Sequence, residues 1–257
     1  MNVHKELYVI TGASKGLGSE IALAVSKNNA ILLLISRDET KLTSVAQKCS
    51  ENGAVVFTIF EDISKNSFPK KFKTILNQIL SENIDKCYLF NNASIIDPIK
   101  KLVNINRTDQ RRVLDINLTS AIWITSELLR ACQIYKPLET YIVNISSGVS
   151  LKPINGWSLY CISKSGINML TSCIAEETSN WENKVHSVAI NPGALDTEMQ
   201  KKIRESDINE SPIAERFIKM HDEGKLNHPN QVAIKILKIL KVEPFPNGQF
   251  VDFNLIN

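Results

Sequence analysis

The chain has 257 residues, of which 43% are hydrophobic and 22% charged, and its formal net charge is +3. This length suits one large α/β domain with its own core, and so small a charge gives no reason to expect a nucleic-acid partner. The five cysteines form no Cys-x-x-Cys pair and no histidine has a partner at metal-ligand spacing, so we expect no metal and reduced thiols, as in a cytoplasmic protein.

Short apolar runs alternate with longer helical patterns along the chain. Strands are predicted at 7–10, 31–35, 55–60, 87–90, 140–145, 185–190 and 249–253. Helices are predicted after a Gly-rich turn up to about residue 27, then at 38–49, 68–80, 109–132, 159–180 and 231–241. This alternation predicts β-α-β units, and the apolar strands are typical of a parallel sheet covered on both faces. We therefore predict one Rossmann-type α/β domain over residues 1–257, with a doubly wound parallel sheet of about seven strands.

The two ends of the chain and one internal segment add to this picture. The first residues lead directly into a strand and do not resemble a signal peptide. No apolar run approaches the roughly 18 residues of a membrane span. The irregular polar segment at about 199–230 follows a strand end, where ligands bind in open α/β sheets, and is a candidate substrate lid.

The turn from the first strand to the first helix, Thr11 to Gly18, has the sequence TGASKGLG. Gly12 permits a tight turn, Gly16 allows close approach of a pyrophosphate, and Gly18 allows the helix to pack against the sheet. The helix N-terminus also offers free N–H groups to phosphates. Because this glycine pattern lies between a strand and a helix, it predicts a dinucleotide-binding site.

The end of the second strand indicates which nicotinamide cofactor is bound. Arg37 and Lys15 are suited to a 2′-phosphate, whereas an acidic residue would favour a free 2′-OH. Asp38 is the competing observation, but it is better placed as the N-cap of the next helix. The sequence therefore favours NADPH over NADH.

Tyr160 and Lys164 are four residues apart and share one helix face, with Ser147 thirteen residues before the tyrosine. We expect the lysine ammonium to lower the pKa of the tyrosine and the serine hydroxyl to hold a substrate carbonyl. This arrangement suits proton delivery to a carbonyl oxygen, while the hydride must come from a cofactor. Cys161, beside the tyrosine, has no histidine near it in sequence and is interpreted as a packing residue.

These motifs together resemble the classical short-chain dehydrogenase/reductase family over nearly the whole chain, and within it the sepiapterin reductase and benzil reductase branch. The narrower resemblance rests on the segments around Ser147, Trp157, Met199 and Asp252. Members of this branch use NADPH and are commonly dimers, so the resemblance implies a homodimer. The apolar helix at about 116–129 is either a dimer face or core packing.

The resemblance also implies roles for individual residues. The catalytic set comprises Asn117, Ser147, Tyr160 and Lys164, with Asn117 steadying a water behind the lysine. The expected cofactor contacts are Gly12, Ser14, Lys15, Gly16, Leu17, Gly18, Arg37, Asp62, Asn91, Ala93, Tyr160, Lys164, Pro192, Gly193, Leu195 and Thr197. The expected substrate contacts are Ser147, Trp157, Tyr160, Gly193, Met199 and Asp252.

Three of these positions carry open questions. The family motif Asn-Asn-Ala-Gly ends here in Ser94, and serine resists backbone angles that glycine accepts, so the loop could shift or bind the cofactor less well. Asp252 is either the carboxylate that anchors the guanidine-like edge of a pterin or a solvated charge at a strand end. Trp157 either lines the substrate pocket or packs in the core.

The sequence thus predicts an NADPH-dependent carbonyl reductase of the sepiapterin reductase type, acting on a ketone or vicinal diketone of a pterin or aromatic compound. A general diketone reductase of the benzil type is the alternative within this class. A regulator that senses NADPH without chemistry is the alternative from another class, because fold alone does not settle function.

Overall fold

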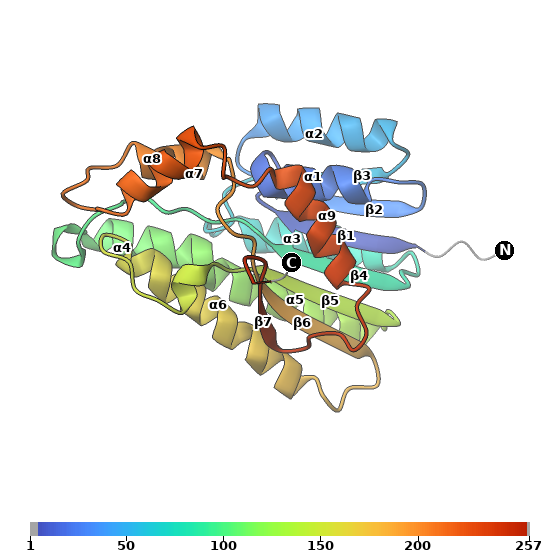
Figure 1. The fold of residues 1–257 in the computed structure, drawn as a ribbon. Helices are drawn as coiled ribbons and strands as arrows, with labels where there is room; N and C mark the ends of the chain where they lie inside the picture. Colours follow the sequence, from blue (N-terminus) through green and yellow to red (C-terminus); the bar gives the residue numbers. More distant parts are fainter. Residues whose placement is uncertain (1–4, 256–257) are drawn as a thin grey trace.

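The structure is a computed structural model that describes residues 5–255, and its seven parallel strands form one sheet in the order β3-β2-β1-β4-β5-β6-β7 (Figure 1). The strands are β1 (Glu6–Thr11), β2 (Ala30–Ser36), β3 (Val55–Phe60), β4 (Lys86–Asn91), β5 (Glu139–Ile145), β6 (Lys184–Asn191) and β7 (Gln249–Asp252). The predicted doubly wound parallel sheet is confirmed, with strand bounds that differ from the expected ones by at most one residue at either end.

The order in which successive strands are added to the sheet reverses at β1, because β1 pairs with β2 on one side and with β4 on the other. In open α/β sheets the ligand binds beyond the carboxyl ends of the strands at this switch point. Here those ends carry the glycine turn after β1 and the Asn-Asn-Ala-Ser segment after β4. The topology therefore places the two predicted cofactor segments side by side.

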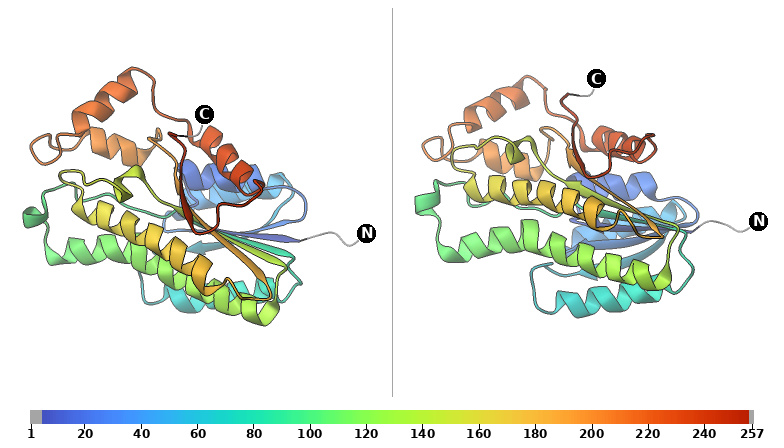
Figure 2. Two further views of the ribbon diagram at one scale, coloured as in Figure 1. Left: turned by 60° about the horizontal axis from the view of Figure 1, so that its bottom comes forward. Right: turned by 90° about the horizontal axis from the view of Figure 1, so that it is seen from below.

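Helices cover both faces of the sheet. They are α1 (Gly16–Val25), α2 (Glu39–Glu51), α3 (Phe68–Leu80), α4 (Arg107–Leu114), α5 (Ser120–Tyr135), α6 (Ser158–Glu177), α7 (Glu198–Arg204), α8 (Ala214–Asp222) and α9 (Pro229–Ile239). Side chains of α1, α2 and α9 pack on one face, and those of α3, α5 and α6 on the other, which gives two core layers (Figure 2). Strand β2 lies between both layers, and this explains its continuous apolar run.

One long predicted helix is interrupted in the structure. Between α4 and α5 the residues Asp115–Thr119 form a π-helical turn, so the helical region runs from 107 to 135 with a local widening in its middle. Such turns are often found at functional sites. This one carries Asn117, which is buried at 2% exposure.

The segment after β6 contains α7 and α8, which lie beyond the carboxyl ends of the strands (Figures 1 and 2). The polar segment at 199–230 therefore covers the edge at which the switch point opens. Within residues 5–255 no helix is long and apolar enough to cross a membrane.

Candidate active site

The glycine turn after β1 has the shape of a phosphate cradle. Gly12 and Gly16 have φ angles of +67° and +59°, which side-chain-bearing residues rarely adopt. A Cβ added at Gly18 would lie 2.4 Å from the carbonyl oxygen of Gly12, so the start of α1 packs directly on the turn. Lys15 at the N-cap gives no side-chain cap, and the first N–H groups of α1 remain free for an anion. The turn thus fits the diphosphate of a dinucleotide.

Thr11 ties the end of β1 to the segment after β4. Its Oγ1 donates to the carbonyl oxygen of Phe90 at 3.2 Å. The same oxygen accepts hydrogen bonds from the N–H groups of Asn92 and Ala93, both at 3.0 Å. The Asn91 side chain turns inward instead and donates to Thr125 and Asn144. Its Oδ1 accepts no hydrogen bond from the described residues, and Asn91 lines the small cavity beside Lys164.

Leu17, another of the expected cofactor contacts, has a side chain buried in the core at 5% exposure. Only its backbone N–H, at the start of α1, is placed for a phosphate. Ser14 faces the end of β2 and shares a hydrogen bond of 2.8 Å with Ser36. The hydroxyl of Ser14 therefore lies between the glycine turn and the strand that carries the predicted 2′-phosphate site.

Asp38 caps α2, as the sequence predicts. Its Oδ1 accepts a hydrogen bond from the backbone N–H of Lys41 at 3.0 Å. An acidic side chain in this role satisfies a free helix donor and is not directed at a ribose hydroxyl.

Cationic side chains gather around this end of β2. Lys15 and Lys41 both bond the Glu198 carboxylate at the start of α7, the latter at 2.8 Å. These lysines hold the pKa of Glu198 at about 2. The Arg37 guanidinium lies 3.6 Å from the carboxylate of Asp62, two residues after the end of β3, and the Arg37 side chain is largely exposed. Lysines from two elements therefore converge on one anionic group beside the glycine turn, a geometry that also suits a phosphate.

Tyr160 and Lys164 lie on the buried face of α6, and Ser147 follows β5. The Lys164 Nζ lies 5.4 Å from the centre of the tyrosine ring and donates a 2.7 Å hydrogen bond to the carbonyl oxygen of Ile145. Lys164 is 3% and Tyr160 9% exposed. The hydroxyl of Ser147 is near enough to the phenol to lower its pKa. The structure thus brings together the three residues that the spacing singled out.

The direction of the tyrosine pKa differs from the sequence-based expectation. Burial raises the pKa of Tyr160 to about 12, although the hydroxyls of Ser147 and Ser94 lower it in part. Burial also lowers the pKa of Lys164 to about 7, so the lysine is a weak source of positive charge here. The expected lowering of the tyrosine pKa by the ammonium is therefore wrong for this state, because desolvation outweighs it.

The neighbouring residues Ser146 and Ser147 have different surroundings in the structure. Ser146 is buried and donates to Asn168 Oδ1 at 2.6 Å, which is a structural role. Ser147 instead begins a short 3-10 turn and accepts a weak bond of 3.4 Å from the Val149 N–H. Its hydroxyl remains available to a carbonyl.

Asn117 acts as a clamp on the segment after β4. Its side-chain oxygen accepts from the Ile95 N–H and its nitrogen donates to the Ile95 carbonyl, both at 2.8 Å, with a further 3.3 Å bond to Ser163. The amide nitrogen therefore donates two hydrogen bonds and the amide oxygen accepts one within the protein.

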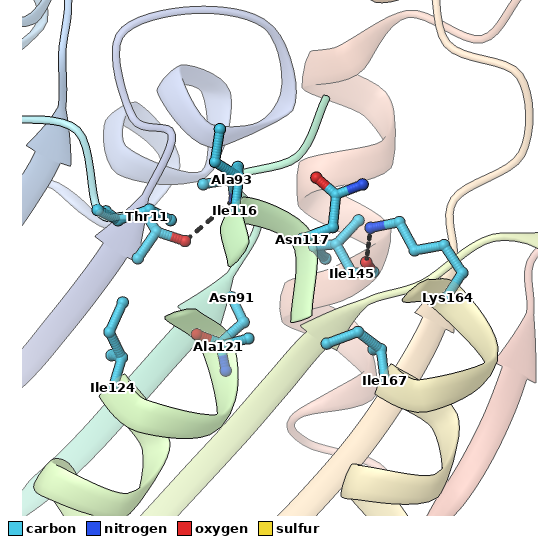
Figure 3. A pocket seen from close by; sticks show the side chains of 11 residues that line it. Thr11, Asn91, Ala93, Ile116, Asn117, Ala121, Ile124, Ile145, Lys164 and Ile167 are labelled. Carbon is cyan, nitrogen blue, oxygen red and sulfur yellow. Dashed lines mark hydrogen bonds between the residues drawn. The ribbon is translucent and has the colours of Figure 1, made fainter. Parts of the chain in front are cut away.

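A small cavity of about 10 Å³ lies behind the lysine. Its lining includes Thr11, Ala93, Asn117 and Lys164, and Figure 3 shows the Lys164 amine beside Asn117 and directed at the Ile145 carbonyl. This is about the smallest volume that holds one water molecule. The position suits a water in contact with the lysine.

On its other side Tyr160 meets an apolar, aromatic wall. Trp157 lies edge-on to the tyrosine with ring centres 6.0 Å apart, and stacks on Phe217 of α8 at 5.8 Å. The indole N–H donates to Ser211 at 2.9 Å. A Cβ at Gly156 would meet the Glu210 carbonyl at 2.4 Å, so only glycine permits this close contact. Trp157 therefore joins Tyr160 to the 199–230 segment.

Several residues of this wall were not identified from the sequence. They are Ile96, Ile203, Ile213 and Phe217, which pack with Tyr160, Trp157 and the predicted Met199. Cys161 packs there as well, in keeping with its interpretation as a packing residue. The helical spacing of apolar residues in α7 and α8 predicts a buried face, but nothing local shows what that face covers.

The segment after β6 lies over the glycine turn. Gly193, which follows Pro192, has a φ of +77°, and Leu195 pairs with Asn227. Thr197 caps α7, and its Cγ2 would lie 3.3 Å from a Cβ at Gly16. The structure therefore brings the start of α7 next to the glycine turn.

Asp252 ends β7 beside this segment. Its Oδ1 accepts hydrogen bonds from the side chains of Asn191 and Asn254 and from the Asn254 N–H, at 2.8 to 2.9 Å. Among the described residues these bonds leave only Oδ2 for a ligand. A two-point contact with a guanidine-like edge requires both oxygens.

The comparisons with known proteins show the family of this chain. The family described as short chain dehydrogenase matches residues 6–208. A benzil reductase ((S)-benzoin forming) of Bacillus cereus is 34% identical, covering 95% of this chain and 97% of the relative. A sepiapterin reductase of Rattus norvegicus is 30% identical, covering 95% of both chains.

Solved structures show the same fold. The crystal structure of the KRED1-Pglu enzyme superposes with a TM-score of 0.81 at 25% identity, over 96% of this chain and 100% of that one. A 3-oxoacyl-[acyl-carrier protein] reductase from Brucella melitensis, in complex with NAD, gives a TM-score of 0.79 at 20% identity over 98% of this chain and 96% of that one, and shows the fold alone.

Proposed function

Because this chain belongs to the short-chain dehydrogenase family and is an oxidoreductase acting on carbonyl groups, we propose that it is an NADPH-dependent ketone reductase, a single catalytic domain over residues 1–257. The observation that carries the proposal is the buried phenol of Tyr160, flanked by the Ser147 hydroxyl and with the Lys164 ammonium on the same helix face. Bound nicotinamide supplies the hydride.

The residues divide the remaining work. Ser147 donates a hydrogen bond to the substrate carbonyl and fixes its orientation. Tyr160, which is protonated at neutral pH and whose pKa burial raises further, gives its proton to the developing alkoxide. Lys164, through a water in the small cavity behind it, returns a proton to the phenol. The hydrogen bonds between Asn117 and Ile95 hold the segment that faces Lys164 and the phenol.

The test of this assignment is Tyr160→Phe. We expect NADPH oxidation with a ketone present to fall by about 10²–10⁴, while NADPH binding, measured by fluorescence, is retained. An unchanged rate would remove the catalytic assignment. Binding of NADPH with no turnover of any ketone by the unaltered protein would instead favour the regulator.

The preference for NADPH rests on the cations near the end of β2. Arg37, Lys15 and Lys41 offer positive charge to a 2′-phosphate. In the structure the Glu198 carboxylate binds both lysines, in the way that a phosphate could. We expect Arg37→Ala and Lys41→Ala to raise the KM for NADPH about tenfold and to leave that for NADH unchanged. Lys48→Ala, an exposed substitution at the far end of α2, is the matched control. Equal effects on both cofactors would contradict the assignment.

Two substrate classes remain, and the site favours one of them. The wall of Trp157, Phe217 and Ile203 suits an uncharged aromatic ketone or vicinal diketone. Asp252, the predicted pterin anchor, already uses one oxygen on Asn191 and Asn254. We therefore place the diketone first and the pterin second.

Turnover of benzil and sepiapterin separates these substrates. We expect Asp252→Asn to keep benzil reduction, because the asparagine oxygen can still accept the bonds that Oδ1 takes. A selective loss of sepiapterin turnover in this variant would assign Asp252 to a pterin and reverse our order.

A homodimer and a lid complete the proposal. Helices α5 and α6 lie side by side (Figure 2) and expose Ile122, Ile162 and Met169, a surface that suits a second copy. Met169→Glu should shift the protein to a monomer in light scattering, whereas Ile234→Glu on α9 should not. The five free cysteines fit a cytoplasmic protein. The 199–230 segment, docked on Trp157, is proposed to close over the substrate.

A further inference from the structure

Ser94 occupies the position at which the family motif carries a glycine, and its backbone is not strained. Within the described residues, positive φ angles at non-glycine positions occur only at Asn29, Asn83 and Lys136. The loss of glycine therefore costs no left-handed conformation. The loop shift that the sequence raised as a concern has no basis in the backbone, and the hydroxyl itself is the feature that requires an explanation.

The backbone holds Ser94 firmly on both sides. The N–H of Ala93 donates to Thr11 Oγ1 at 3.0 Å, and the N–H and carbonyl of Ile95 are bound by the Asn117 amide at 2.8 Å each. A residue between two such anchors keeps its side chain in a fixed direction. Ser94 is therefore presented to the site by a rigid segment.

The segment that carries Ser94 packs against Tyr160. Ile96, two residues on, packs in the same cluster as Tyr160, so the segment runs along the tyrosine. The Ser94 hydroxyl oxygen is buried but makes no hydrogen bond of good geometry with the described residues. The same hydroxyl nevertheless lies near enough to the phenol to lower the pKa of Tyr160, as Ser147 does.

A buried hydroxyl without a well-formed bond is costly unless it gains a partner in another state of the protein. That state is supplied when the phenol transfers its proton and its oxygen becomes negative. A hydroxyl fixed beside the oxygen then donates a charge-assisted hydrogen bond, which is about twice as strong as a neutral one.

We propose that Ser94 is a further residue of the reaction centre, whose hydroxyl donates to the phenol oxygen of Tyr160 and stabilises it after proton transfer. This inference rests on the proposed reductase function. It gives the acid two hydroxyl neighbours, Ser147 from the β5 side and Ser94 from the β4 side. In the reverse direction, oxidation of the alcohol, the same bond favours the phenolate that must accept the proton.

The test uses Ser94→Ala, Ser94→Gly and the control Ser172→Ala, whose hydroxyl is exposed on α6. We expect both Ser94 variants to bind NADPH normally but to lose about tenfold in kcat. Without the bond the phenolate is less stable, so the pH profile of alcohol oxidation should move about one pH unit to the alkaline side. The control should leave kcat and the profile unchanged.

A second measurement does not depend on turnover. NMR titration of ¹³C-labelled tyrosine, with the Tyr160 signal assigned through Tyr160→Phe, reports the phenol directly. A higher pKa in the Ser94 variants supports the proposal, and an unchanged pKa overturns it. A loss of kcat/KM with an unchanged pKa would assign the hydroxyl to substrate instead. If the unaltered protein reduces no ketone, the proposed function fails and the titration still decides the role of Ser94.

Discussion

Replacing Lys164 by methionine should stabilise the free protein while it destroys activity. The ammonium is almost fully buried, and burial lowers its pKa from the ordinary 10.5 to about 7. The folded protein therefore binds this proton less tightly than the unfolded chain does. Stability that is present above pH 10.5 is lost progressively as the pH falls toward 7, and the loss is complete below that value.

The size of the effect follows from the pKa. A fall from 10.5 to about 7, at about 1.4 kcal/mol for each pH unit, corresponds to roughly 5 kcal/mol at pH 6. Methionine has a similar volume and no charge, but it removes the 2.7 Å hydrogen bond to the Ile145 carbonyl. Leaving that acceptor unpaired costs about 1–3 kcal/mol. We therefore expect Lys164→Met to be more stable by about 2–4 kcal/mol at pH 6.

Urea unfolding between pH 6 and pH 10 measures this difference. The advantage of Lys164→Met should shrink as the pH rises above about 7, because the folded lysine is then neutral and the free-energy cost of removing its proton falls as the pH approaches the 10.5 of the unfolded chain. Lys235→Met, on the exposed face of α9, is the control and should show neither the gain nor the pH dependence. A variant that is less stable at pH 6, or a difference that does not change with pH, would refute the reasoning.

Two further substitutions test the contacts around the site. Gly18→Ala should destabilise the protein by about 1–3 kcal/mol and abolish NADPH fluorescence enhancement, because its Cβ would lie 2.4 Å from the Gly12 carbonyl oxygen. Gly224→Ala is the control for cofactor binding: its φ of +63° makes alanine costly in stability, but no atom lies within 4 Å of its Cβ, so binding should be kept. Trp157→Phe should lower the free energy of unfolding in urea by about 1–2 kcal/mol, because Ser211 loses the 2.9 Å hydrogen bond from the indole. It should also raise the KM for benzil, and an unchanged KM would show that Trp157 does not contact the substrate.

The local pattern of the sequence was sufficient for the fold. Each strand and helix shows its own periodicity, since burial of one face depends on residues close in the chain. The run 31–35 predicted a strand covered on both faces, and the structure places it between two core layers. The glycine turn and the tyrosine-lysine pair were likewise readable, because a turn or a single helix fixes the relation of their residues.

What only the tertiary structure decided are the contacts between distant segments. Ser94 meets a tyrosine 66 positions later, and Trp157 meets Phe217 of α8 at 5.8 Å, although nothing local relates these residues. The pKa of Tyr160 also rose where the neighbouring lysine predicted a fall. Spacing along a helix shows which charge is near, whereas desolvation depends on every side chain that excludes water, and those side chains come from several elements.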